Sequence, residues 1–241
     1  MDHLLELGSA MTRFTELTSK ATGEEQVPGC PDWDFRDLAT HLGTIHRWAA
    51  AIVLSGQRVK LPQPVVTEPL ADWYAGTAAA LLGALQAVSP DEVVPNFTHL
   101  NERAAFFARR QMHEATVHVV DAAQALGLEE SEWQVAPEIA ADGVDEVLQV
   151  FFPRMTAQGR RPDVRCRIRL IATDTGQEWV IAPGSGDFTP PLQLHPSYHS
   201  DASVHGTAAD LYLSLWHRVS RFRLEFEGTD ATALFDGPTT P

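Results

Sequence analysis

The hydrophobic residues in the first 125 positions recur every three or four residues, which is the spacing of amphipathic helices. In the first such stretch they are Leu4, Leu5, Leu7, Met11, Phe14 and Leu17. Segments containing glycine or proline separate four stretches of this kind. The pattern predicts helices over about residues 2–22, 32–55, 74–88 and 102–125.

Residues at the ends of these stretches support the assignment. Asp32 and Asp34 both precede the second stretch, and either side chain can accept hydrogen bonds from the first free amides of a helix. Asn101 has the same position before the fourth stretch, and Gly127 follows its end. Four helices within about 127 residues predict a bundle, a fold that often builds metal sites from inward-pointing side chains.

After about residue 130 the pattern changes. Residues 139–152 and 207–216 still have helical character, but residues 164–171 and 178–181 have strand character and flank a turn at 174–176. Residues 202–204 and 222–226 predict further strands, and the tail after Gly237 is expected to fray. We therefore expect a two-domain α+β chain, with a helical bundle over residues 1–132 and a smaller α+β domain over residues 133–241.

Composition excludes several classes of protein. Hydrophobic residues make up 44% of the 241 positions and charged residues 21%, as in soluble globular proteins. The 18 Lys and Arg residues against 32 Asp and Glu give a net charge of −14, which argues against nucleic acid and anionic membranes as partners. No apolar run is long enough to span a bilayer and the start lacks a basic segment followed by an apolar one, so we expect a cytoplasmic protein.

The two cysteines, Cys30 and Cys166, are far apart and no C-x-x-C occurs, which argues against a disulfide framework and against a cysteine-rich zinc site. We expect Cys30 to be a buried or idle loop cysteine rather than a nucleophile. Any bound metal must therefore use histidine and carboxylate ligands.

Glu114 and His118 are the first candidates for such ligands. They are four residues apart on a predicted helix, so their side chains project only about 40° apart and can hold one ion. His113 and His118 are five apart, about 140° around the helix, so they do not form the H-E-x-x-H pair of zinc proteases. The upstream helix carries His41 and His46 and can supply a third ligand. Two nitrogens and one oxygen would make an open catalytic type of site, whereas the alternative is an exposed helix-surface pair.

Three stretches of the chain resemble one enzyme family. Residues 28–49, with Trp33, His41 and Trp48, resemble the first signature of the mycothiol-dependent maleylpyruvate isomerase family, a branch of the DinB-like metalloenzymes. His113-Glu114-x-x-x-His118-x-x-Asp121 is similar to the second signature. Residues 201–218, which end in Trp216-His-Arg218, are similar to a third stretch. The matches occur in both halves, in the family's order, and together extend over nearly the whole chain.

The resemblance implies a fold, a site and a cofactor. It implies a DinB-like bundle, a sterol-carrier-protein-like second domain, and a divalent metal, usually zinc, held by His41, Glu114 and His118. His46 then packs in the bundle or supports the site, and His113 is structural or faces solvent. The resemblance also implies mycothiol as the thiol cosubstrate, and this agrees with the chemistry of such a site, because a bound dication converts a thiol to the nucleophilic thiolate. Arg218 stands at the family's Trp-x-Arg position and is the candidate catalytic residue that holds a substrate carboxylate, with a surface salt bridge as the alternative.

We therefore expect a mycothiol-dependent enzyme, monomeric or homodimeric, that is either an S-transferase acting on small electrophiles or a cis-trans isomerase of the maleylpyruvate type. The second half shows no obvious cluster of basic residues for a dicarboxylate, which favours S-transfer. A non-catalytic metal- and thiol-binding protein and a metal-dependent hydrolase are the alternatives. The sequence predicts that Trp33 and Trp48 pack in the bundle and that Arg47, Arg109 and Arg110 are solvated surface charges.

Overall fold

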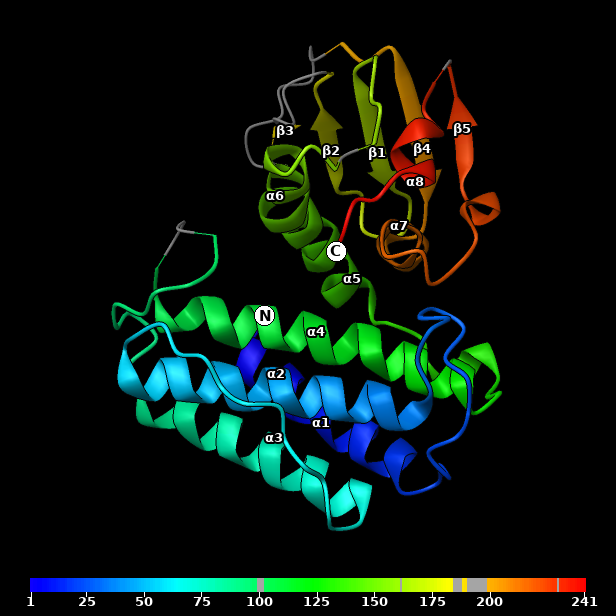
Figure 1. Cartoon of the computed structure of the whole chain (residues 1–241). Helices are drawn as coiled ribbons and strands as arrows, with labels where there is room; N and C mark the ends of the chain where they lie inside the picture. Colours follow the sequence, from blue (N-terminus) through cyan, green and yellow to red (C-terminus); the bar gives the residue numbers. More distant parts are fainter. Residues whose placement is uncertain (99–101, 161, 184–187, 190–198, 229) are drawn as a thin grey trace. The chain divides into compact units, whose positions relative to one another are not determined.

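The structure, a computed structural model, describes residues 1–98, 102–160, 162–183, 188–189, 199–228 and 230–241 (Figure 1). The chain divides into two compact units, Met1–Gln134 and Val135–Pro241. Helices dominate the first unit and the second combines helices with a sheet, so the predicted mixed α+β class is confirmed. Among the described residues, no helix has both the length and the apolarity that crossing a bilayer requires.

Four long helices form the first unit. They are α1 (His3–Thr18), α2 (Phe35–Ser55), α3 (Leu70–Ala87) and α4 (Ala104–Ala125), followed by a short 3-10 helix, η1 (Glu130–Glu132). Helix α1 packs against α3 and α4, and α2 packs against the same two helices, so the four close into a bundle (Figure 1). The four predicted helices are confirmed, with ends that differ by a few residues.

Hydrogen bonds at the helix ends explain where α2 and α4 begin and end. Of the two aspartates that can cap α2, Asp34 does so: its side chain accepts from the backbone amide of Asp37, whose own carboxylate accepts from the amide of Asp34. Helix α4 has Arg103 as its first flanking residue without a side-chain cap, and the predicted cap Asn101 lies outside the described residues. Gly127, with φ of +66°, follows the end of α4 as predicted.

The apolar residues that predicted the helices form the core of the bundle. Leu7, Phe14, Phe35, Tyr74 and Phe107 are all fully buried. Gly43 of α2 lies against the ring of Trp73 of α3, and a Cβ atom at this position would overlap that ring. The close approach of α2 and α3 therefore depends on this glycine.

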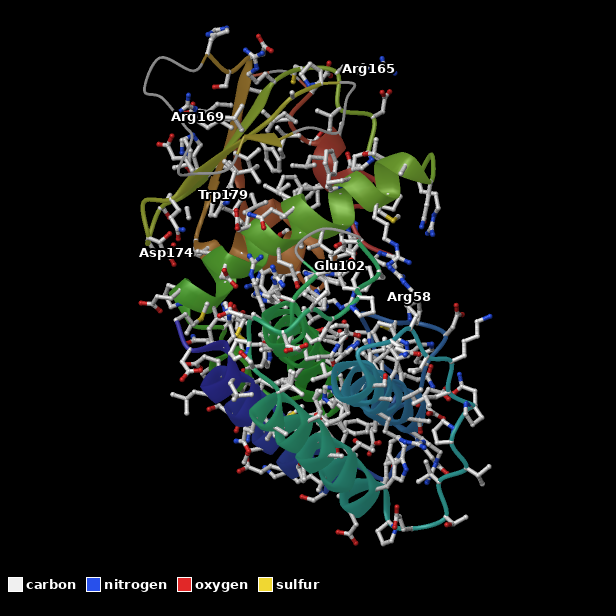
Figure 2. The ribbon with its side chains drawn as sticks, turned by 90° about the vertical axis from the view of Figure 1, so that its left-hand side faces the viewer. Arg58, Glu102, Arg165, Arg169, Asp174 and Trp179 are labelled. Atoms are coloured by element: carbon white, nitrogen blue, oxygen red, sulfur yellow. The ribbon has the colours of Figure 1, made fainter. Side chains whose placement is uncertain are left out.

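Among the residues that the structure describes, a five-stranded sheet forms the centre of the second unit. Its order is β3 (Phe188–Thr189), β2 (Glu178–Ile181), β1 (Ile168–Ala172), β4 (Ala202–Gly206) and β5 (Glu225–Glu227). Strand β1 pairs antiparallel with β2, which confirms the predicted hairpin, and parallel with β4. The paired residues Leu170 and Trp179 are fully buried on one face, whereas Arg169 lies on the other and its guanidinium pairs with Glu178 at 2.6 Å (Figure 2).

Helices cover part of this sheet. Helix α5 (Pro137–Glu146) continues through a π-helical turn, η2 (Val147–Phe151), into α6 (Phe152–Ala157). Helix α7 (Ala208–Leu215) packs against α5 and against strands β1 and β4. Thr207 caps α7 by accepting from the amide of Asp210. A short 3-10 helix, η4 (Arg221–Arg223), and helix α8 (Ala233–Asp236) follow in the described part of this unit.

Two predictions for the C-terminal end are wrong. The stretch 222–226 is not one strand, because Ser220 accepts from the amide of Phe222 and begins the 3-10 helix η4; only β5 is extended, and Phe222 is 86% exposed. The tail is not frayed: Thr239 is fully buried, its hydroxyl donates to the carbonyl of Leu215, and Thr240 is also buried. Contacts with the end of α7 thus fix residues whose sequence shows no periodicity.

Candidate metal centre

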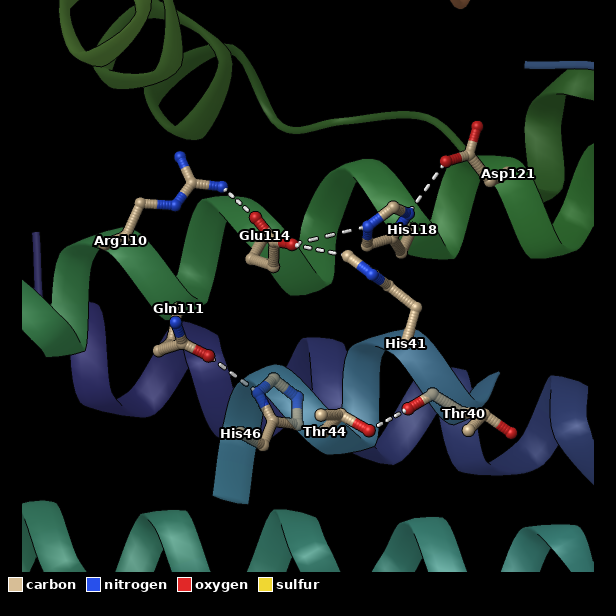
Figure 3. Close-up of polar contacts among 9 residues, drawn as sticks. All are labelled: Thr40, His41, Thr44, His46, Arg110, Gln111, Glu114, His118 and Asp121. Carbon is tan, nitrogen blue, oxygen red and sulfur yellow. Dashed lines mark hydrogen bonds and ion pairs between the residues drawn. The ribbon is translucent and has the colours of Figure 1, made fainter. Parts of the chain in front are cut away.

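Two neighbouring helices bring three of the predicted site residues together (Figure 3). His41 comes from α2, and Glu114 and His118 come from successive turns of α4. Oε1 of Glu114 lies 3.2 Å from Nε2 of His41 and 3.5 Å from Nε2 of His118. One donor atom from each residue lies within 4.8 Å of the others. The predicted ligand set is therefore one cluster in space.

The two separations that involve Glu114 fit a small divalent cation. Two ligands bonded at about 2.1 Å to a tetrahedral ion are about 3.4 Å apart, and the separations of 3.2 Å and 3.5 Å are close to this value. An imidazole, a carboxylate and a second imidazole are also the donor types of open catalytic zinc sites. The three residues can hold such an ion with a coordination position left for another molecule.

Asp121 orients His118 for this role. Its carboxylate is fully buried and accepts a hydrogen bond from Nδ1 of His118 at 2.8 Å, which leaves Nε2 directed at Glu114 (Figure 3). Burial by itself lowers the pKa of His118, but the hydrogen bonds and charges of Asp121 and Glu114 outweigh it and raise the pKa to about 8. The position between His118 and Glu114 therefore favours a positive charge.

Arg110 holds the other oxygen of Glu114. Its Nη2 donates to Oε2 at 2.5 Å, and its side chain is only 4% exposed. Burial raises the pKa of Glu114, but Arg110 and the two histidines hold it well below its usual range. Glu114 is thus an ionised carboxylate with one oxygen on Arg110 and the other on the two imidazoles. The expectation that Arg110 is a solvated surface charge is wrong.

His41 is the most accessible of the three residues, with a side chain 34% exposed. The Trp33 ring packs on its imidazole, with centroids 4.7 Å apart, and lies 6.3 Å from that of His118. A pocket of about 480 Å³ opens beside it, lined by Trp33, Asp37, Thr40, His41, Thr44, Ile45 and Gln63. Trp33 therefore packs as predicted, but it packs on the site itself.

His46 lies inside the bundle, where its ring nitrogens contact Gln111 and Tyr74. It is fully buried, its Nδ1 lies 2.8 Å from the carboxamide oxygen of Gln111, and its Nε2 lies 3.2 Å from the hydroxyl of Tyr74. Burial lowers the pKa of His46 to about 4, so the ring is neutral. The packing role expected for His46 is confirmed. His113 is also fully buried, so of its two expected roles the structural one holds.

Arg218 belongs to the second unit. Its Nη1 donates to the carbonyl of Trp216 at 2.6 Å, and it lines a pocket of about 370 Å³ with Ser214, His217, Ser220, Arg221 and Phe222. His217 adopts φ of +57°, the left-handed conformation that often ends helices, directly after α7. The second half thus brings two arginines and a histidine to one pocket, and all three come from the short stretch 217–221 that joins α7 to η4. The expectation of no obvious basic cluster in this half overlooked their closeness in the sequence.

The roles of Arg110 and Asp121 were not predicted from the sequence. Arg110 precedes Glu114 by four residues and Asp121 follows His118 by three, so both spacings place each pair on one face of α4. The spacing therefore indicated that each pair can interact. It could not show that these side chains are buried.

Comparisons with known proteins identify the family. Residues 4–123 match the family model described as the mycothiol maleylpyruvate isomerase N-terminal domain, and residues 138–237 match the model of that enzyme's C-terminal domain. No curated protein sequence matches the chain significantly.

Among solved structures, the chain is similar to a mycothiol-dependent maleylpyruvate isomerase at 15% identity and to a mutant of a mycothiol-dependent maleylpyruvate isomerase, in which one histidine is replaced by alanine, at 14%. Both have a TM-score of 0.64, and each match covers 93% of this chain and 91% of the other. These identities establish a common fold, while the two family models cover both units in order. The chain belongs to the mycothiol-dependent maleylpyruvate isomerase family of enzymes.

Proposed function

We propose that this protein is a metal-dependent enzyme that activates mycothiol as a nucleophile toward a small electrophilic substrate. The observation that carries the proposal is the convergence of His41, Glu114 and His118, whose donor atoms lie within 4.8 Å of one another. Zinc is the proposed cation, the first unit is proposed to be a DinB-like bundle, and the second a sterol-carrier-protein-like domain. The proposed location is the cytoplasm.

The residues of the site divide the work between them. His41 and His118 would bind the cation through Nε2 and Glu114 through Oε1, because these are the atoms that face one another. When bound, the cation would supply the charge that lowers the pKa of a coordinated thiol. Asp121 keeps Nδ1 of His118 protonated and so keeps Nε2 free to bind. The pocket beside His41 and Trp33 offers space for the thiol.

Isomerisation is the reaction favoured first, because it is the activity in the name of the family. The thiolate sulfur would add to one carbon of a substrate double bond conjugated to a carbonyl group, and the electron pair of that π bond would move onto the carbonyl. The adduct would rotate about the resulting single bond, and the double bond would re-form as the thiolate leaves. We propose that Arg218 holds a carboxylate of the substrate. A guanidinium suits this task because its planar fork matches a carboxylate. The neighbouring Arg221 lines the same pocket but already pairs with Asp236 at 2.8 Å.

S-transfer is the second candidate, because it uses the same activated thiol and differs only in releasing the adduct as product. The two reactions separate when the metal-loaded protein and mycothiol are given either maleylpyruvate or monochlorobimane. Isomer formation with full recovery of the thiol supports the isomerase, whereas stoichiometric thiol consumption with a fluorescent conjugate supports the transferase. Saturable thiol binding without either product would support a binding protein, and product formation without added thiol a hydrolase.

The ligand assignment has its own test. We expect His41→Ala, Glu114→Ala and His118→Ala each to remove most of the bound zinc, measured by elemental analysis after purification and dialysis. His199→Ala is the control, because this side chain is 80% exposed and belongs to the second unit. Full zinc retention by any of the three variants would refute that ligand.

A further inference from the structure

The two oxygens of Glu114 have different partners. Oε1 faces the imidazoles of His41 and His118, whereas Oε2 accepts from Nη2 of Arg110 one helical turn earlier (Figure 3). A carboxylate beside a divalent cation can bind through one oxygen or through both. The Arg110 contact directs the second oxygen toward the guanidinium, which leaves Oε1 as the oxygen that faces a cation between the histidines.

The burial of Arg110 needs an explanation. An Arg–Glu pair four residues apart on a helix is ordinarily a solvated surface pair of small energetic value. Here the arginine side chain is 4% exposed and that of Glu114 is 16% exposed. Apolar side chains in place of a buried ion pair often leave a protein equally stable or more stable, so a gain in stability alone does not account for a buried guanidinium at this position.

We propose that Arg110 is a positioning residue that restricts Glu114 to binding the cation through Oε1 alone and so keeps a coordination position open for the thiol. This inference rests on the proposed metal-dependent function. The guanidinium fork suits the role because it is planar, always charged and donates in a fixed direction. Arg110 acts on Glu114 as Asp121 acts on His118. Arg110 donates to Oε2 of Glu114, Asp121 accepts from Nδ1 of His118, and in both ligands the other polar atom is the one that faces the cluster.

Cobalt(II) in place of the native cation provides a direct readout, because its visible absorption weakens as the number of ligands rises from four toward six. The variants are Arg110→Met, which keeps much of the side-chain length and removes the charge, and Arg110→Lys, which keeps a charge and a donor. Arg13→Met is the matched control, because Arg13 also pairs with a glutamate on its own helix, Glu16 at 3.2 Å, but lies on α1 with a side chain 31% exposed, against 4% for Arg110.

We expect Arg110→Met to retain cobalt but to show the weaker absorption of a higher coordination number. Its dissociation constant for 2-mercaptoethanol, followed by the sulfur-to-cobalt charge-transfer band, should rise at least tenfold, the lower end of the effect of residues that orient metal ligands. Arg110→Lys should recover part of both signals, and Arg13→Met should match the wild type. A merely structural role would change the amount of folded protein, seen by circular dichroism, without changing the absorption of each bound cobalt.

The inference is overturned if folded Arg110→Met has the cobalt spectrum and the thiol affinity of the wild type. If Arg110→Met does not fold, the same two measurements on Arg110→Gln decide, because glutamine removes the charge and is too short to reach Oε2 in the same way. Failure of the wild type itself to bind cobalt or 2-mercaptoethanol would instead overturn the proposed function, and this inference with it.

Discussion

His46 makes the stability of the bundle depend on pH in a way that the structure quantifies. Its ring is fully buried between Gln111 and Tyr74, and burial lowers its pKa from 6.5 to about 4. In the unfolded chain the ring takes up a proton near pH 6.5, whereas in the folded protein it does so only near pH 4. The unfolded state therefore binds more protons between these values, and folding stability falls as the pH drops through this window.

The size of the effect follows from the shift. The difference of about 2.5 pKa units corresponds to about 3 kcal/mol once the pH is below both values. Between pH 7 and pH 5 the same two pKa values give a loss of roughly 2 kcal/mol from this single residue. His118 acts in the opposite direction: its raised pKa adds stability that is complete below about 6.5 and is lost as the pH rises through about 8, so it offsets part of the His46 effect between pH 7 and pH 5. The test therefore uses a variant in which His118 is still present.

The test compares the metal-free wild type with His46→Asn, whose amide keeps a donor toward Gln111 but does not titrate. Urea unfolding followed by circular dichroism at pH 7, 6 and 5 gives the free energy of unfolding of each protein. The variant should gain roughly 2 kcal/mol relative to the wild type between pH 7 and pH 5. Titrating groups that both proteins share change the two free energies of unfolding equally, so their contributions cancel when the free energy of one protein is subtracted from that of the other.

Tyr74→Phe serves as the control. It removes one hydrogen-bond partner of His46 but leaves the titrating ring buried, and burial is the main cause of the low pKa. We expect this variant to keep the pH dependence of the wild type. A constant stability difference between wild type and His46→Asn across the three pH values would refute the neutral, buried state assigned to His46.

Two further predictions concern the site and the packing of the bundle. Asp121→Asn should weaken zinc binding about 10- to 100-fold in competition with a chromophoric chelator, because His118 loses the carboxylate that orients it; unchanged affinity would show that this hydrogen bond has no such role. Gly43→Ala should lower the free energy of unfolding by about 1–3 kcal/mol because its Cβ meets the Trp73 ring. Gly83→Ala, at a helical position with open space, should instead raise it by about 0.5–1 kcal/mol, so equal effects of the two substitutions in urea unfolding would contradict the packing described.

The helices of the first unit were predictable because their signals are local. A stripe of apolar residues and a capping aspartate at Asp34 define α2, and a similar stripe followed by Gly127 defines α4. The pairing of Glu114 with His118 follows from helix geometry alone. His41 entered through the family resemblance, since periodicity left His46 as an alternative.

The C-terminal end was less predictable because its structure depends on distant contacts. The alternation through Phe222 predicts a strand, but Ser220 begins a 3-10 helix and leaves Phe222 exposed. Thr239 is buried because its hydroxyl reaches the end of α7, which no local pattern records.

The burial of residues around the candidate metal centre was also not predictable from the sequence. Arg110 and Glu114 have the spacing of a common surface pair, but in the fold their charged groups are largely shielded from solvent, and Asp121 is fully buried. Glu114 and Asp121 place two carboxylates beside the ring of His118, and the guanidinium of Arg110 pairs with the first of them. Buried charge of this kind is costly unless it is balanced. A proton on His118, whose pKa is raised to about 8, balances it in the metal-free protein, and a divalent cation can do the same by displacing that proton.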